Sequence, residues 1–344
     1  MRVAVVGAGI AGAAAAFHLA GRGHTVTLYE QFESGHDRGS SHGNSRIVRK
    51  AYPDAFYTEI MLEGYPMWHA LQRECPEPLL HEVGLVVFGS EQSAEMQGML
   101  RGLEALGVPH DLEGARRMPT LRIGEHEIAV WTPEAGWVHA ARAVRHLVSR
   151  AEAMGAECRR ERVASLERLE ADYDAVVLCA GAWNAKFLEL PVEVSLQTFA
   201  YLDAPQGGPV WIEDSARFPY GFPSEPGAST FKVGIHQRGA AIDPDDPHRE
   251  PSTEALDAIR DVAARRFGVA EPRLDGAKGC LYTSTANEDF LLGRVGEKIV
   301  FASACSGHGF KFGPWVGKTL ADFVEGKSDP SNYPRLAFTP KRLA

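Results

Sequence analysis

The chain has 344 residues, of which 44% are hydrophobic and 24% are charged, and its formal net charge is -9. These values are ordinary for a folded globular protein and argue against a disordered chain or a fibrous repeat, while the length favours two lobes over a single core. The acidic balance offers no electrostatic footprint for nucleic acid or an anionic membrane surface, so neither is an expected partner.

The first elements in chain order are a strand, a glycine turn, a helix and a second strand. Residues 2–6 predict a short buried strand, residues 13–23 are rich in helix formers, and residues 24–30 alternate in polarity. Apolar residues at helical spacing predict a helix over 56–71. Residues 82–90 and 127–133 predict strands on either side of a helix near 92–106, which we interpret as a βαβ-like insertion.

The second half of the chain repeats this alternation. We expect a helix from residue 139 that stops at Gly155, a buried strand over 173–179 that enters a glycine turn, a helix over 254–267, strands over 279–285 and 298–303, and a closing helix over 315–325. Nucleotide-type elements therefore occur at the start, middle and end of the chain. This predicts an α/β fold in which a Rossmann-type domain is interleaved with a second domain.

The five cysteines are scattered, odd in number and without CxxC or zinc spacing: Cys75, Cys158, Cys179, Cys280 and Cys305. This usage is typical of reduced thiols in the cytoplasm, where we expect the protein, and no metal is expected. Residues 1–23 imitate a secretory signal peptide, but their glycines fit the more demanding pattern described next. No other segment holds a long apolar run, so a membrane span is not expected.

Gly7, Gly9 and Gly12 form a GxGxxG sequence between the first strand and the first helix, and Glu30 closes the second strand. The first glycine permits the turn, the second lets the backbone approach a pyrophosphate, and the third packs helix on strand. The pyrophosphate then lies at the helix N-terminus and the acid accepts from a ribose hydroxyl. Glu30 would repel the 2′-phosphate of NADP, so the pattern predicts FAD or NAD.

Two further features favour FAD. A long polar loop follows Glu30, from residue 31 to residue 50, where a nicotinamide dehydrogenase would continue with regular βαβ units. Gly181 ends the buried strand and would let the backbone approach a ligand, although a simple tight turn is the alternative. The loop also gathers His42, Arg46, Arg49 and Lys50 in "GSSHGNSRIVRKAY", residues 39–52, which in an acidic chain predicts local anions.

At this point the chain resembles the monomeric sarcosine oxidase and N-methyltryptophan oxidase family, flavoenzymes of the D-amino-acid-oxidase superfamily. Besides "VVGAGIAG", the resemblance rests on "GSSHGNSRIVRKAY", "YGFP" (220–223), "FKVGIH" (231–236), "GCLYTST" (279–285) and "SGHGFKFGP" (306–314), in that order and over nearly the whole length. It implies an FAD-binding domain of residues 1–78, 137–188 and 283–344, and a substrate domain with a mixed or antiparallel sheet of residues 79–136 and 189–282.

The resemblance implies roles at the flavin. Cys280 would bear the FAD through a thioether, whereas a free cysteine is otherwise more often structural. His42 and Arg46 would lie beside the flavin ring, and Gly307 and Gly309 belong to a cofactor-binding motif together with Lys311. Lys232 would promote the reaction with oxygen, because a fixed ammonium stabilises the negative charge that develops on it.

The resemblance also implies a substrate site. Arg49 and Lys311 would clamp a carboxylate, and His236 would hydrogen-bond the amine region. Tyr220 and Tyr282 would shape the cavity, although either could be a packed aromatic. Lys50 is left without a role and is expected in solvent.

The expected reaction is oxidative demethylation of a small, sarcosine-like N-methyl amino acid by oxygen, which gives formaldehyde, the primary amino acid and hydrogen peroxide. The enzyme is expected to be a monomer. Two alternatives stay open: another flavin oxidase or dehydrogenase of secondary amino acids of the proline or pipecolate type, and a non-catalytic flavin-binding module.

The sequence departs from the family pattern at several places, and between Cys158 and Asp174 it is shorter than relatives by roughly a hairpin's length. Ser41 stands where relatives often carry a second histidine, and Asn44 replaces an aspartate. Residues 285–290, "TANEDF", replace a Thr-Pro-Asp type sequence, so we expect an altered loop near the flavin. None of these positions belongs to the expected carboxylate clamp, but they bear on the choice of substrate.

Overall fold

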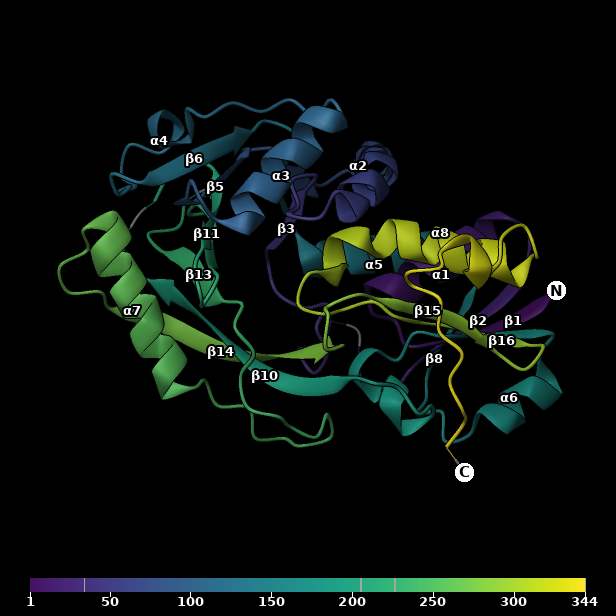
Figure 1. The fold of residues 1–344 in the computed structure, drawn as a ribbon. Coiled ribbons are helices and arrows are strands. Elements are labelled where there is room, and N and C mark those ends of the chain that lie inside the picture. The colour runs from purple at the N-terminus through teal and green to yellow at the C-terminus, as the bar shows by residue number, and fades with distance from the viewer. Residues whose placement is uncertain (34, 205, 226, 344) are drawn as a thin grey trace.

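The computed structural model describes residues 1–33, 35–204, 206–225 and 227–343, which form an α/β fold with three sheets (Figure 1). The first sheet has six strands in the order β15-β16-β9-β1-β2-β8. Their bounds are β1 Arg2–Val6, β2 Thr25–Glu30, β8 Glu157–Arg160, β9 Ala175–Leu178, β15 Leu291–Val295 and β16 Ile299–Ser303. The predicted strands at both ends and in the middle of the chain therefore meet in one sheet.

This first sheet is parallel except at one edge. β1 pairs in parallel with β2 and β9, β2 with β8, and β9 with β16, whereas β15 runs antiparallel to β16. Val3 and Val5 pack toward one group of helices, and Ala4 and Val6 pack toward the other face. Both faces are thus covered, which explains the nearly continuous apolar sequence of β1.

Helices cover the two faces of this sheet unequally (Figure 1). α1 (Ile10–Gly21) packs against both α5 (Ala140–Ala153) and α8 (Gly313–Val324) on one face. α6 (Leu166–Asp172) packs against β9 on the other face. The four alanines of α1 at positions 13–16 are fully buried. Their small side chains and high helix propensity let three helices approach closely.

The second sheet has seven strands in the order β14-β10-β13-β12-β11-β5-β6. It is mixed: most neighbours are antiparallel, and β11 is parallel to β5. The strands are β5 Leu85–Ser90, β6 Glu127–Thr132, β10 Glu193–Leu202, β11 Val210–Asp214, β12 Pro219–Gly221, β13 Phe231–Ile235 and β14 Leu274–Ser284. α7 (Thr253–Phe267) packs on this sheet through Ile259, Val262 and Ala263.

The predicted βαβ-like insertion is wrong in one respect. β5 and β6 pair antiparallel, with Leu85 opposite Thr132 and Ser90 opposite Glu127, so the segment between them is not a parallel crossover. α3 (Ala94–Ala105) and α4 (Gly114–Arg117) both lie within the connection. Hydrophobic periodicity identified the strands and α3, but it carries no information on strand direction.

The polar loop after Glu30 contains a short strand that the sequence did not indicate. β3 (Arg46–Arg49) pairs antiparallel with β7 (Ala135–Val138), which also pairs with β4 (Leu80–His81) to form the third sheet. Residues 31–33 and 35–45 form neither helix nor strand, and Ser34 lies outside the described residues. β3 therefore presents its two arginines from a fixed backbone.

The remaining elements are α2 (Ala55–Glu74) and the 3-10 helices η1 (Gly181–Lys186), η2 (Gly309–Phe312) and η3 (Pro330–Asn332). The two large sheets lie side by side, with β10 and β14 extending toward the nucleotide-type sheet (Figure 1). This is the interleaved α/β architecture expected from the sequence, while the domain boundaries stay a prediction. Among the described residues, no helix combines the length and apolarity needed to cross a membrane.

Candidate active site

The glycine turn between β1 and α1 has the close contacts that its sequence predicts. Gly7 has a φ of 97°, and a Cβ atom placed there would lie 2.5 Å from the carbonyl oxygen of Cys179. A Cβ atom at Gly12 would lie 1.8 Å from the carbonyl oxygen of Gly7. At Gly9 the nearest atom is the Ser41 hydroxyl oxygen, 3.2 Å away. Gly7 and Gly12 are thus required by packing, while Gly9 keeps the backbone accessible.

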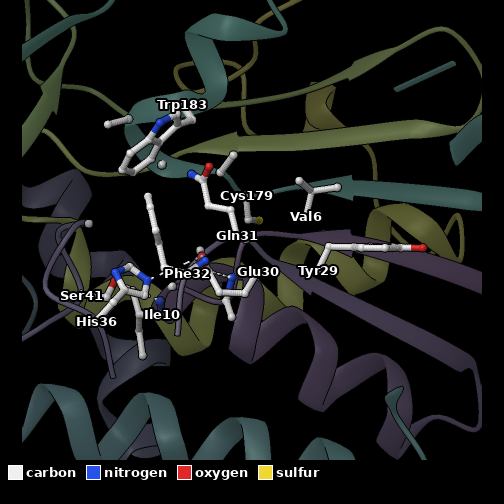
Figure 2. Close-up of a pocket in the computed structure, with 18 of the residues that line it drawn as sticks. Val6, Ile10, Tyr29, Glu30, Gln31, Phe32, His36, Ser41, Cys179 and Trp183 are labelled. Atoms are coloured by element: carbon white, nitrogen blue, oxygen red, sulfur yellow. Dashed lines mark hydrogen bonds and ion pairs between the residues drawn. The ribbon is translucent and has the colours of Figure 1, made fainter. Parts of the chain in front are cut away.

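Glu30 ends β2 beside this turn. Its carboxylate accepts hydrogen bonds from the backbone N–H groups of Ala8 at 2.9 Å and Phe32 at 3.0 Å, and His36 Nε2 lies 3.6 Å away. Burial opposes ionisation, but His36 and the two N–H groups outweigh it and lower the pKa of Glu30. Figure 2 shows Glu30 and His36 turned toward one another. The carboxylate is therefore ionised and fixed for a ribose hydroxyl.

A cavity of about 640 Å³ runs from this turn across the end of the first sheet (Figure 2). Phe32 and Trp183 form one wall, with ring centroids 5.4 Å apart, and Gly181 lies on the same side with a φ of 57°. The lining also includes His42, Thr283 and Cys305, whereas Arg46, Lys232 and Cys280 are not part of it.

Lys232 of β13 is buried among aromatic rings. Its Nζ atom lies 4.5 Å from the ring centroid of Phe199 and 4.8 Å from that of Phe222. It donates a hydrogen bond to the backbone carbonyl of Ser45 at 3.1 Å, one residue before Arg46. Burial, and then the charge of Arg46, lower the pKa of Lys232 well below its ordinary value. This ammonium is therefore destabilised until a negative charge appears nearby.

Cys280 lies on β14 opposite Gln197 of β10 and is only 6% exposed. Burial raises the pKa of its thiol above the ordinary value, and Arg46 and Lys232 offset this effect only in part. Any thiolate formed here is therefore stabilised by these two cations, which links the cationic cluster in the loop to the reactivity of the cysteine.

Lys311 and Arg49 converge on one aromatic ring. Lys311 Nζ donates to the Tyr52 hydroxyl at 2.9 Å and to the backbone carbonyl of His308 at 2.7 Å. The guanidinium carbon of Arg49 lies 4.2 Å from the centroid of the Tyr52 ring. Burial, and then Arg49, lower the pKa of Lys311 well below its ordinary value. Each of these buried cations raises the free energy of the other's charged form, so the pair favours a bound anion.

His308 fixes the direction of these hydrogen bonds. Its Nε2 atom lies 3.1 Å from the carbonyl oxygen of Glu288, which can only accept, and its Nδ1 atom lies 3.3 Å from the Tyr52 hydroxyl. Burial, and then Lys311, lower the pKa of His308 well below its ordinary value, so the ring is neutral. The Tyr52 proton therefore points to His308, and the Tyr52 oxygen accepts from Lys311.

His236 and two tyrosines complete the site on the side of the second sheet. His236 follows β13, and its ring centroid lies 5.6 Å from that of Tyr282 on β14. A Cβ atom at Gly307, which has a φ of 72°, would lie 2.4 Å from the Tyr282 ring and 2.6 Å from the His236 ring. Tyr220 of β12 packs over Gly234 in the same way, because a Cβ atom placed at Gly234 would lie 2.6 Å from the Tyr220 hydroxyl oxygen. These residues form one continuous surface.

Comparison with known proteins agrees with this geometry. The profile described as "FAD dependent oxidoreductase" matches residues 2–323. Human peroxisomal sarcosine oxidase is 31% identical over 354 residues, 92% of this chain and 90% of that protein. The monomeric sarcosine oxidase of Streptomyces avermitilis is 30% identical over 380 residues, 99% of this chain and 97% of that protein. The chain belongs to the sarcosine oxidase family.

Solved structures agree on the fold. The structure of L-proline dehydrogenase from P. horikoshii matches with a TM-score of 0.83 and 21% identity, over 97% of this chain and 98% of that one. As a member of the family, the protein is an FAD-dependent oxidoreductase that acts on the CH–NH group of donors.

The described residues fit FAD. The glycine turn, ionised Glu30 and the cavity beside them suit the dinucleotide. His42 lines the cavity, and its Nε2 atom is buried without a hydrogen-bond partner among the described residues. Burial, and then Arg46, lower the pKa of His42 to about 3, so the ring is neutral. A buried, unpaired ring nitrogen is costly unless a bound group satisfies it.

Lys50 and Gly309 lie in surroundings that the sequence did not indicate. Lys50 is not in solvent: its Nζ atom forms an ion pair with Glu134 at 2.9 Å, and its side chain is 12% exposed. Gly309 faces the protein backbone, because a Cβ atom there would lie 1.8 Å from the carbonyl oxygen of Ala304. That contact gives this glycine a packing reason, and its place in a cofactor-binding motif stays a prediction.

Sequence reasoning missed three residues that organise the site. Tyr52 and His308 stand inside the motifs quoted for the family, so the signal was available, but no role was drawn from it. Ser41, noted only as a departure from the family, accepts a hydrogen bond from the backbone N–H of Ile10 at 3.1 Å at the start of α1. A small hydroxyl there lies against the glycine turn.

Proposed function

We propose that this enzyme oxidatively demethylates a small N-methyl amino acid, sarcosine or a close analogue. The observation that carries the proposal is the convergence of Arg49 and Lys311 on Tyr52, because two buried cations at one point call for a permanent anion such as a carboxylate. Arg49 offers a planar, two-pronged contact, and Lys311 adds a point charge whose direction is set by Tyr52 and His308. An amino acid is then oriented with its amine away from the clamp.

The other residues act on the rest of the substrate and on oxygen. His236 would hydrogen-bond the amine region, with Tyr220 and Tyr282 as the walls of the cavity. Lys232 would stabilise negative charge on oxygen, since its ammonium lies against two aromatic rings and the carbonyl and hydroxyl of Ser45.

When bound, FAD supplies the acceptor for a hydride equivalent and returns the electrons to oxygen. The balanced reaction for sarcosine consumes oxygen and water and gives glycine, formaldehyde and hydrogen peroxide. His42 and Arg46 would then lie beside the reduced, anionic flavin, and Arg49 would contact the substrate carboxylate. The finer choice between sarcosine and cyclic secondary amino acids rests on the shape of the cavity walls.

A peroxide assay tests the proposal. The holoenzyme would be offered sarcosine, other N-methyl amino acids, proline and pipecolate, with formaldehyde measured in parallel. The proposal expects peroxide and formaldehyde in equal amounts with the N-methyl substrates. Oxidation of proline or pipecolate alone, without formaldehyde, would show that the enzyme is instead an oxidase of cyclic secondary amino acids. Flavin reduction without peroxide would point to an electron acceptor other than oxygen.

We also propose that Cys280 holds the flavin through a thioether to its 8α-methyl carbon. Support comes from Arg46 and Lys232, whose charges favour the thiolate and oppose the effect of burial, which raises the pKa of the Cys280 thiol. Acid precipitation distinguishes the outcomes: a yellow pellet is expected for the wild-type protein and a colourless one for Cys280→Ser. Colour that stays in the supernatant of the wild type would exclude covalent attachment.

The scattered, free cysteines support a cytoplasmic enzyme, which we propose to be a monomer. Sedimentation at micromolar concentration would reveal any stable oligomer.

A further inference from the structure

The loop of residues 285–290 presents one carboxylate at the substrate end of the site. Glu288 has a φ of 64°, a left-handed conformation that non-glycine residues seldom adopt. Such a backbone persists only where the surroundings hold it, and it is found most often at functional sites. The loop that the sequence predicted to be altered thus contains a residue with a left-handed backbone, Glu288.

The surroundings hold this loop from three sides. The backbone carbonyl of Glu288 accepts a hydrogen bond from His308, and Arg238 donates to the carbonyl of Thr285 at 2.5 Å. The next residue, Asp289, is buried and forms an ion pair with Arg335 at 2.8 Å, and it accepts from the Tyr57 hydroxyl at 2.8 Å. The position of Glu288 is therefore set by the protein before any ligand arrives.

The side chain of Glu288 points to His236. Its Oε2 atom lies 3.5 Å from His236 Nε2, and its Oε1 atom lies 3.8 Å from Arg238 Nη2. The hydrogen bond from His236 lowers the pKa of the Glu288 carboxyl group, so the side chain is charged at neutral pH. With 45% of its side chain exposed, Glu288 remains accessible to a ligand.

The site therefore has opposite charges at its two ends. Arg49 and Lys311 meet on Tyr52, while Glu288 lies beyond His308 and against His236. A substrate whose carboxylate is held by the two cations sends its amine and N-substituent toward His236. A methyl group carries no charge to be repelled there, whereas a second carboxylate meets that of Glu288.

We propose that Glu288 is a specificity-determining residue, which excludes substrates that carry a second carboxylate on the amine side and admits those with neutral or basic groups. This inference rests on the proposed function, because it uses the orientation given by Arg49 and Lys311. The substrate class that follows is monocarboxylic N-alkyl amino acids. Arg238 would attract an anionic substituent once Glu288 no longer neutralises it, so removal of the Glu288 charge is expected to weaken the preference for monocarboxylates.

The test compares two thioethers that cannot be oxidised at an amine. Methylthioacetate has the shape of sarcosine with sulfur in place of nitrogen, and thiodiglycolate adds a second carboxylate. Their Kd values would be measured by calorimetry on the holoenzyme for the wild type, Glu288→Gln, Glu288→Asn and the exposed control Glu297→Gln. Gln keeps the size of Glu288, and Asn tolerates the left-handed backbone better.

We expect the wild type and Glu297→Gln to bind thiodiglycolate with a higher Kd than methylthioacetate. In Glu288→Gln the Kd of thiodiglycolate divided by that of methylthioacetate should fall by about tenfold, as removal of one repelling charge at a half-exposed position predicts. Glu288→Asn should change this ratio in the same direction.

An unchanged ratio in both Glu288 variants, or an equal loss of affinity for both ligands, would overturn the inference and assign Glu288 a structural role, while methylthioacetate binding would leave the proposed function standing. If the wild type fails to bind methylthioacetate at all, the carboxylate clamp and the proposed function fail, and the inference that depends on them fails too. The flavin content of each variant shows whether it has folded.

Discussion

Two buried lysines of this protein have different surroundings. Lys232 lies between two phenylalanine rings and donates to one backbone carbonyl, whereas Lys311 shares an aromatic ring with Arg49 and donates to Tyr52 and His308. Burial lowers the pKa of both well below the ordinary value. Lys232, set among aromatic rings with Arg46 as its charged neighbour, suits a negative charge that appears briefly. Lys311 and Arg49, which meet on one tyrosine, suit an anion that is always present.

The first prediction removes the cation that lies among aromatic rings. Lys232→Met should slow reoxidation of the reduced flavin by oxygen by about 10²–10³-fold, the usual loss when one preorganised charge stabiliser is deleted. Anaerobic reduction of the enzyme by substrate should change little, because Lys232 lies apart from the carboxylate clamp. Stopped-flow absorbance measures the two half-reactions separately, and equal losses in both would remove the distinction between the two lysines.

The second prediction removes one of the paired cations. Arg49→Ala should raise the Kd of methylthioacetate by about 10²-fold, in line with the loss of one partner of a buried charge contact. Flavin binding and reoxidation should be retained. Titration of the flavin spectrum gives the Kd, and an unchanged value would show that Arg49 does not contact the carboxylate.

The third prediction concerns pH. An anionic ligand needs Lys311 protonated, and burial together with Arg49 holds the pKa of Lys311 well below its ordinary value. The affinity is therefore highest below that lowered pKa and falls as the pH rises through it, by about tenfold per pH unit for one linked proton. Lys311→Arg keeps its charge and should flatten the profile. A wild-type Kd that is constant up to pH 10 would contradict a lowered pKa at Lys311.

The fourth and smallest effect concerns the cation next to the clamp in the sequence. Lys50 pairs with Glu134 near the surface, so Lys50→Ala should lower the free energy of unfolding by less than about 1 kcal/mol. The Kd of methylthioacetate and the reoxidation rate should match the wild type. A large rise in Kd would mean that the clamp holds three cations.

Residues that act through local backbone geometry could be predicted from the sequence. Gly7, Gly12 and Glu30 obey a short-range pattern. The contacts of Gly12 with Gly7 and of Glu30 with Ala8 follow from strand, turn, helix and strand in succession, whereas that of Gly7 with Cys179 does not. Lys232 and Lys311 have no such pattern, because an isolated lysine in a sequence is usually solvated, and their expected roles came only from the family resemblance. Their burial became visible in the structure.

Contacts between distant segments could not be predicted, because no local sequence pattern indicates them. Lys50 was expected in solvent because its partner, Glu134, lies 84 residues further along the chain. The antiparallel pairing of β5 and β6 was missed for a related reason, since alternation predicts a strand but not its direction. The same holds for Asp289 and Arg335, whose ion pair joins segments 46 residues apart.

The ion pairs of Arg335 also constrain the order in which the protein matures. Arg335 contacts Asp289 and also Asp54, the residue that caps the start of α2. Both partners are synthesised earlier, so neither contact can form before residue 335 has left the ribosome. Domains tend to fold as they emerge, but the first sheet also waits for late segments, because β15 and β16 follow Glu288 in the chain and α1 packs against α8. A nascent chain would therefore complete its nucleotide-binding half and the loop that carries Glu288 together, near the end of synthesis.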